Sequence, residues 1–133
     1  MKVLLDTHMW VWWLTPASPL TRAERAALDA TAEACELGLP AVSMWEAQVL
    51  HSKGRLELPM PFAEWLMRAT DERMLSVLPL DRDVVLALDG LPPGFHGDPV
   101  DRLIVATARA HALPLATRDA AIRRARVARL WKP

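Results

Sequence analysis

Short apolar segments alternate with helical segments along the whole chain, and this alternation constrains the fold more than any other feature. The first apolar segment, residues 3–5, is apolar on both faces, as a buried strand of a parallel sheet would be. Strands that alternate with helices are typical of an α/β fold with a mainly parallel sheet. At 133 residues the chain has the length of one ordinary domain, so we expect a single domain over residues 1–133. The predicted strands are 3–5, 39–42, 74–80, 114–117 and 127–130.

Several of the predicted helices have a typical first residue. Thr21 and Glu24 have the spacing of a capping box, and so do Ser43 and Glu46. Asp98 is a typical N-cap residue, and the proline that follows it is typical of the first helical position. The predicted helical segments are 10–14, 21–36, 43–54, 62–69, 82–89, 98–111 and a short helix from 119.

Four acidic residues occupy similar places in these strand–helix units. Asp6 ends the first strand, and Glu46 lies in the first helical turn after the second. Asp101 lies in the first turn of the helix that follows a Pro/Gly loop, and Asp119 follows the fourth strand by two residues. Ligands bind beyond the carboxyl ends of the strands in an open parallel sheet. We therefore expect the four side chains to converge at one edge of the sheet.

Four carboxylates in one pocket repel one another and raise each other's pKa unless a cation lies among them. All-oxygen ligand sets select hard cations, here Mg²⁺ or Mn²⁺. Such an ion can orient a phosphodiester and stabilise its leaving oxygen. The pattern therefore indicates hydrolysis of phosphoryl bonds.

Each acid also has a structural interpretation, and the sequence leaves both open. Glu46 can be the capping-box partner of Ser43, Asp101 can favour a helix N-terminus, and Asp119 can be a helix cap. Asp6 is the hardest to explain in this way, because aspartate is depleted in strands. Capping and metal binding are compatible roles.

The order of these motifs resembles the PIN domain family, and most closely its VapC-type toxins. The resemblance implies a three-layer α/β fold with a five-stranded, mainly parallel sheet in the order 3-2-1-4-5, flanked by helices. It also implies a Mg²⁺- or Mn²⁺-dependent endoribonuclease that acts on structured RNA. Proteins of this family are usually homodimers, and a cognate antitoxin protein holds them inactive. The resembling motifs are LLDTH at 4–8, VSMWE at 42–46, GDPVDRLIVATA at 97–108 and LATRD at 115–119.

The resemblance places the family's acidic quartet on Asp6, Glu46, Asp101 and Asp119. We infer that Asp6 and Asp101 hold the main ion and that Glu46 positions or deprotonates the attacking water. Asp119 either completes the ligand set or binds a second, weaker ion. The resemblance also places a supporting hydroxyl at Thr117.

Two further residues belong to the predicted site. Ser43 is expected to support it from the start of its helix. Asp98 lies three residues before Asp101, so both can face the pocket from one helical turn. We favour Asp101 as the ligand and Asp98 as a helix cap that can also contact the metal.

Charge and cysteine content bear on partners and location. The formal net charge is zero, so the composition does not by itself indicate nucleic acid. Basic residues gather near the C-terminus, where Arg118, Arg123 and Arg124 either contact RNA phosphates or form a solvated helix face. The single cysteine, Cys35, and the lack of a signal or membrane segment favour the cytoplasm.

Two other functions compete with a nuclease. A haloacid-dehalogenase-like phosphatase also has an aspartate after its first strand, but it needs a second one two residues later, where this chain has His8. An inactive PIN-like binding module is the other alternative, and retention of all four acids argues against it. His8 and His96 are interpreted as polar surface groups.

Overall fold

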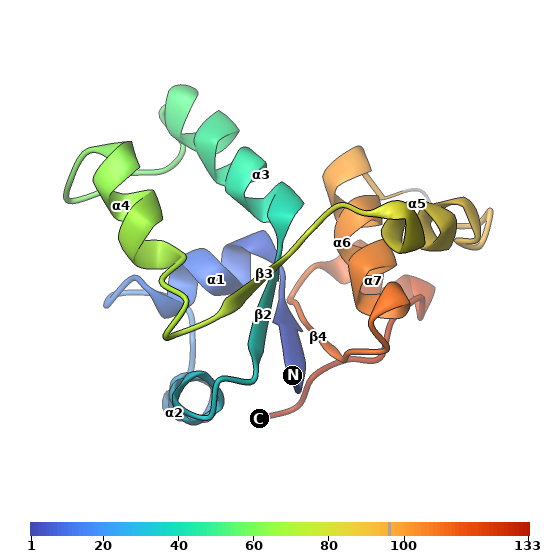
Figure 1. The fold of residues 1–133 in the computed structure, drawn as a ribbon, viewed down its shortest axis with the longest axis horizontal. Helices are drawn as coiled ribbons and strands as arrows, with labels where there is room; N and C mark the ends of the chain where they lie inside the picture. The colour runs from blue at the N-terminus through green and yellow to red at the C-terminus, as the bar shows by residue number, and fades with distance from the viewer. Residues whose placement is uncertain (96) are drawn as a thin grey trace.

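A parallel sheet lies at the centre of the computed structural model, which describes residues 1–95 and 97–133 (Figure 1). Its four strands have the order β3-β2-β1-β4, and all neighbouring pairs are parallel. The predicted α/β class is therefore confirmed. The strands are β1 (Val3–Leu5), β2 (Leu37–Pro40), β3 (Ser76–Leu78) and β4 (Leu115–Ala116).

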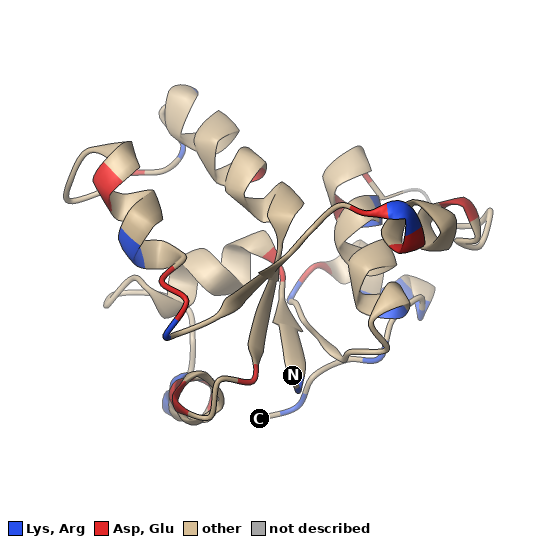
Figure 2. Cartoon of the chain, in the orientation of Figure 1, with Lys and Arg blue, Asp and Glu red and all other residues tan. Residues whose placement is uncertain are grey.

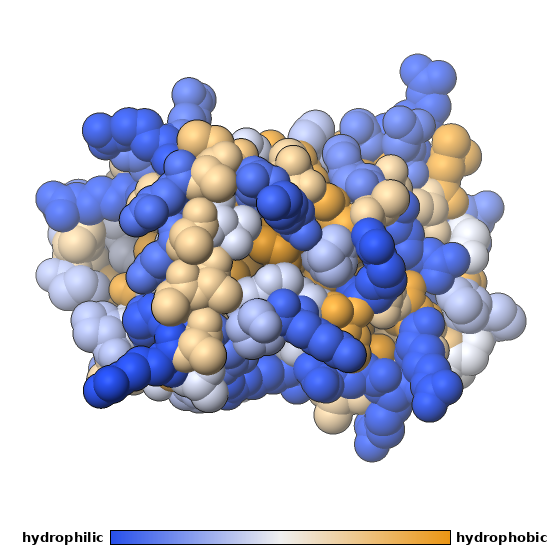
Figure 3. Space-filling view, turned by 90° about the horizontal axis from the view of Figure 1, so that it is seen from below, coloured by the Kyte–Doolittle hydropathy of each residue, from blue (hydrophilic) through white to orange (hydrophobic). Residues whose placement is uncertain are grey.

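Helices cover both faces of this sheet, which gives three layers (Figure 1). None of the described helices is long and apolar enough to cross a membrane. Seen from below relative to Figure 1, the surface is mainly hydrophilic, with apolar side chains visible between the polar ones (Figure 3). The helices are α1 (Thr7–Trp13), α2 (Arg22–Glu33), α3 (Ala41–Ser52), α4 (Phe62–Ala69), α5 (Arg82–Asp89), α6 (Pro99–Ala110) and α7 (Ala120–Ala125).

The central strand β1 separates two hydrophobic cores. Val3 and Leu5 point into the core under α1, α2 and α4, whereas Leu4 points into the core under α5, α6 and α7. Successive side chains of a strand point to opposite faces, so a strand buried on both sides is apolar at every position. This is why the short run at residues 3–5 predicted a buried strand correctly.

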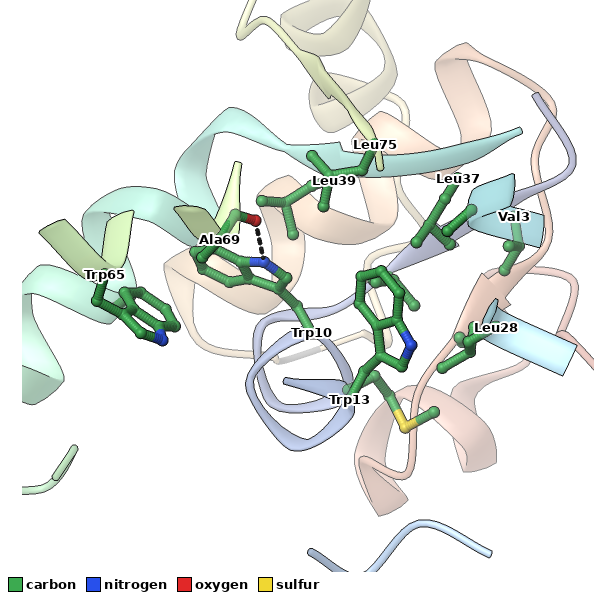
Figure 4. Packing of buried hydrophobic residues seen from close by; sticks show 14 residues of the cluster. Val3, Trp10, Trp13, Leu28, Leu37, Leu39, Trp65, Ala69 and Leu75 are labelled. Carbon is green, nitrogen blue, oxygen red and sulfur yellow. Dashed lines mark hydrogen bonds between the residues drawn. The ribbon is translucent and has the colours of Figure 1, made fainter. Parts of the chain in front are cut away.

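Tryptophans fill much of the first core (Figure 4). Trp10 is fully buried, and its indole N–H donates to the Ala69 carbonyl over 2.9 Å, which ties α1 to α4. Trp13 lies on the same helix face and donates to Asp29 over 2.8 Å. Trp12 points elsewhere and is only partly buried.

The boundary between β2 and α3 differs from the prediction. The strand spans Leu37–Pro40 rather than 39–42, and the helix begins at Ala41. Pro40 is the N-cap and makes no side-chain capping bond, so the predicted capping box of Ser43 and Glu46 is wrong. The chain turns directly at the proline, which places Ser43 inside the first helical turn and Glu46 in the second.

The predicted fifth strand, 127–130, is reduced to one parallel bridge between Leu115 and Leu130. Leu115 donates to the Arg129 carbonyl over 2.8 Å and accepts from the Trp131 amide over 2.9 Å. β4 is only two residues long, so Leu115 alone provides both the N–H and the carbonyl that pair with the C-terminal segment. The order 3-2-1-4 is confirmed, and the segment at position 5 pairs too briefly to be a strand.

Other boundaries also differ from the prediction, among them those of α1 and β3. α1 begins at Thr7, earlier than the predicted helical segment 10–14, because Asp6 caps it. β3 is shorter than the predicted strand 74–80.

Candidate active site

Asp6 lies where β1 ends and α1 begins. Its backbone amide still pairs with the Ala116 carbonyl over 3.1 Å, while its carboxylate accepts from the Met9 amide over 2.8 Å and caps the helix. Asp6 is 6% exposed. Asp6 therefore has a clear structural role as a helix cap, in addition to any chemical role. The sequence had suggested a weaker structural explanation for Asp6 than for the other three acids.

Glu46 lies in the second turn of α3 and is partly buried. The helix begins too early for Glu46 to cap it, and no ion pair between described residues engages its carboxylate. The capping interpretation of Glu46 therefore fails, and its exposure to a cavity at the sheet edge is what distinguishes it.

Two acids lie at the start of α6. Asp98 is the N-cap and accepts from the Asp101 amide over 2.8 Å, as predicted. Asp101 is in the first turn and is half-buried. One helical turn thus presents two carboxylates, of which only Asp98 has a capping bond.

Asp119 caps α7 by accepting from the Ile122 amide over 2.9 Å. Its own amide donates to the Thr117 hydroxyl over 3.0 Å, and Thr117 is buried. The Thr117 hydroxyl also interacts with the Asp6 carboxylate and lowers the pKa of that group. Thr117 therefore links two of the predicted acids.

All four predicted acids, together with Asp98, line one cavity of about 310 Å³. In Figure 2, acidic positions are coloured along the backbone of α3, near the start of α6 and beyond the ends of the central strands. The cavity lies at the carboxyl edge of the parallel sheet, which is where the topology predicts a ligand site. We call it the acidic cavity, and it is lined by Asp6, His8, Trp12, Glu46, Asp98, Asp101, Arg118 and Asp119.

The carboxylates of the acidic cavity influence one another. The pKa of Asp101 rises from 3.8 to about 7, first because of burial and then because of the charge on Asp98. The charges on Asp119, Glu46 and Asp6 raise it further. Burial also raises the pKa of Asp6, against the opposing effects of the Thr117 hydroxyl, the Met9 amide and His8.

A divalent cation fits this donor set by its chemistry. Neutralisation by a cation would relieve the repulsion that raises the pKa of Asp101, and carboxylate oxygens are the ligands of hard cations. In the described part of the chain, no three acidic, histidine or cysteine side chains are close enough together to hold an ion as they stand. Binding therefore requires the side chains to turn inward around the ion.

Three residues near these acids were not part of the predicted site. Thr7 follows Asp6, and its hydroxyl donates to the Ser43 hydroxyl over 2.9 Å, with both groups buried. His8 is exposed, as predicted for a polar surface group, but it also lines the acidic cavity, as does Trp12. Adjacency to Asp6 was the only signal for Thr7 and His8. His96, the other histidine interpreted as a surface group, lies outside the described residues.

The three arginines expected to contact RNA have different environments. Arg118 donates to the Glu24 carboxylate and to the Pro19 carbonyl, and its guanidinium lies 5.7 Å from the centre of the Trp12 ring. Arg123 donates to the Thr117 carbonyl over 3.1 Å. Arg124 is exposed on α7.

The PIN domain family matches residues 3–128, which is nearly the whole chain and includes all four acids. The chain belongs to the PIN domain family. A curated relative, Ribonuclease VapC22 of Mycobacterium tuberculosis (strain ATCC 25618 / H37Rv), is 38% identical over 122 residues, which are 91% of this chain and 89% of the relative. PIN-domain ribonucleases generally depend on divalent metal ions, which agrees with the donor set.

Solved structures share the PIN fold. The crystal structure of VapBC2 from Rickettsia felis bound to a DNA fragment from their promoter matches with a TM-score of 0.76 and 17% identity, over 98% of each chain. The structure of FitAB bound to an IR36 DNA fragment matches with a TM-score of 0.72 and 22% identity, over 98% of this chain and 94% of that one. Because the chain belongs to the PIN domain family, the haloacid-dehalogenase-like phosphatase is no longer considered as an alternative.

Proposed function

We propose that this PIN domain is a Mg²⁺- or Mn²⁺-dependent endoribonuclease that hydrolyses phosphodiester bonds in structured RNA. The observation that carries the proposal is the acidic cavity, which Asp6, Glu46, Asp101 and Asp119 line together. The 38% identity to a ribonuclease supports the same class of reaction and substrate.

We assign the acids the roles that the resemblance suggests. Asp6 and Asp101 would be the main metal ligands, and Asp119 would complete the set. Asp98 caps α6 and adds a carboxylate on the same turn. When bound, the cation supplies positive charge that stabilises the negative charge developing on the phosphodiester.

Glu46 orients the attacking water and accepts its proton, because its carboxylate has no capping bond or ion pair among the described residues. The water oxygen forms a bond to phosphorus, one ester P–O bond breaks, and the leaving oxygen takes a proton from solvent. Thr117 orients Asp6 and Asp119, while Ser43 supports the site from α3 through its bond with Thr7.

We also propose that the chain is the toxin of a type II toxin–antitoxin pair, acts in the cytoplasm as a homodimer and is inhibited by a cognate antitoxin. This rests on the resemblance to VapC-type toxins and on the relationship to Ribonuclease VapC22.

Cleavage of RNA by the purified protein, freed of antitoxin, tests the enzymatic proposal. We expect cleavage with Mg²⁺ or Mn²⁺ and none in chelator. Asp6→Asn should reduce the rate by at least about 100-fold without lowering the melting temperature, because asparagine caps helices as well as aspartate does.

The matched control is Asp89→Asn, which removes the same charge from an exposed position at the end of α5. It should cleave at the wild-type rate. Undiminished cleavage by Asp6→Asn, or cleavage in chelator, would contradict the proposal. Cleavage of no RNA with either metal would favour the inactive binding module instead.

A further inference from the structure

A second cavity, of about 420 Å³, adjoins the acidic cavity. Its volume is in the range of about 300–1,000 Å³ that is usual for small-molecule sites. Arg118 lines both cavities and forms part of the wall between them. We call the second one the basic cavity, and its polar lining comes from Glu24, Thr117, Arg118, Arg123 and Lys132.

The basic cavity has an excess of positive charge. Glu24 is paired with Arg118, so these two charges largely offset each other. Arg123 and Lys132 are both exposed, and no ion pair between described residues engages either of them. Two uncompensated cations therefore face a space that directly adjoins five carboxylates.

The wall between the two cavities is firmly built. The Arg118 guanidinium is held by Glu24 and Pro19 and packs against the Trp12 ring, which itself lines the acidic cavity. Arg123 donates to the carbonyl of Thr117, whose hydroxyl accepts from the Asp119 amide. The position of the cationic groups is thus tied to the segment that carries one of the catalytic acids.

RNA has to overcome repulsion before it reaches the acidic cavity, because phosphates and carboxylates carry the same charge. A neighbouring group of cations that accepts an adjacent phosphate would offset this repulsion and fix the strand in place. We propose that the basic cavity binds the backbone phosphate of a nucleotide next to the scissile one, through Arg123 and Lys132, with Arg118 as the wall between the two. This inference rests on the proposed ribonuclease function and adds a phosphate subsite to it.

Binding of a short fluorescein-labelled single-stranded RNA, followed by fluorescence anisotropy in chelator, tests the subsite without cleavage. Arg123→Gln and Lys132→Gln should each weaken binding by about 3–10-fold. Each should also reduce the slope of log Kd against log salt by up to about 0.7, because the two residues share one phosphate and a whole phosphate contact on a single strand contributes about 0.7.

The chain offers a matched control for each variant. Arg82→Gln removes the same charge from an exposed position at the start of α5, and Lys53→Gln does so at the end of α3; neither residue lines either cavity. Both should bind like the wild type. Lys132→Gln keeps the test decisive if Arg123→Gln disturbs the fold through the lost bond to Thr117.

Cleavage of the same RNA by the wild type with Mn²⁺ separates this inference from the proposed function. If all four variants bind RNA as tightly as the wild type, and the wild type cleaves it, the subsite is overturned and the nuclease function stands. Equal weakening in all four would also overturn it, since binding would then depend on net charge alone. Selective weakening in the two cavity variants without wild-type cleavage would support the subsite and overturn the nuclease.

Discussion

Single residues in this PIN domain combine two roles that the sequence presented as alternatives. Asp6, Asp98 and Asp119 each cap a helix, and each lines the acidic cavity. The reason is geometric. The helices α1, α6 and α7 begin at the carboxyl edge of the sheet, so their N-caps lie where the ligand site lies.

Asp101 differs from these caps because it makes no capping bond, and its raised pKa makes it a source of instability in the metal-free protein. The folded state holds the proton more tightly than the unfolded state, so stability is lost as the pH rises from 3.8 through about 7. Asp101→Asn should therefore raise the melting temperature in chelator, and more at about pH 8 than at about pH 5. Allowing for solvent screening of a half-buried group, we expect about 1 kcal/mol, or ~4 °C, at the higher pH. Calorimetry that shows equal gains at both pH values, or a loss, would refute this assignment.

Thr7 makes a buried bond to Ser43 that fixes the start of α1 against α3. Thr7→Val should cost about 1–2 kcal/mol, because the Ser43 hydroxyl loses its buried partner. We expect a lower kcat for RNA cleavage with little change in KM, since Asp6 and Glu46 lie on the two helices that this bond joins. Thr7→Ser keeps the hydroxyl and should restore both stability and kcat. A lower kcat in Thr7→Ser as well would mean that packing at this position affects catalysis, because serine keeps the hydroxyl and loses only the methyl group.

At the scale of whole elements, the N-terminus of α6 brings two carboxylates to the cavity. Asp98→Ala should lose about 1 kcal/mol of stability through the lost cap, and Asp98→Asn should lose very little. Both remove a charge that raises the pKa of Asp101, so the pH profile of cleavage should shift toward lower pH.

Asp81 provides the matched control for this cap. It caps α5 by accepting from the Val84 amide over 3.0 Å, and it lies outside the acidic cavity. Asp81→Ala should cost a similar amount in thermal unfolding and leave the pH profile of cleavage unchanged. A shift of the same size in both alanine variants would mean that the profile reports stability rather than charge.

At the scale of the whole molecule, four strand–helix units converge on one charged cavity, so an ion bound there should stabilise the entire fold. We expect the melting temperature at about pH 8 to rise with Mn²⁺ concentration. The free energy of unfolding should increase by about 2.7 kcal/mol when the Mn²⁺ concentration is a hundred times Kd. The rise should be smaller at about pH 5, where protonated carboxylates bind cations less well. Asp6→Asn should reduce the effect and Asp89→Asn should not. An equal rise in all three proteins would mean that the ion binds elsewhere.

Local pattern was enough for the sequence to predict the alternating α/β architecture and an acid at the end of its first buried strand. A buried strand is apolar at every position, and an acid at its end is conspicuous, so Asp6 could be found from residues 3–6 alone. The helix caps at Thr21 and Asp98 could also be predicted from the sequence, because a cap depends on residues only three positions apart.

Tertiary structure decided what depends on residues far apart in the chain. It placed the turn at Pro40, which removed the capping role of Glu46, and it reduced the fifth strand to one bridge at Leu130. It also paired Arg118 with Glu24 and Thr7 with Ser43. The periodicity of apolar residues and the spacing of motifs do not predict such contacts. The contacts form only when the packed sheet brings distant segments to the same edge.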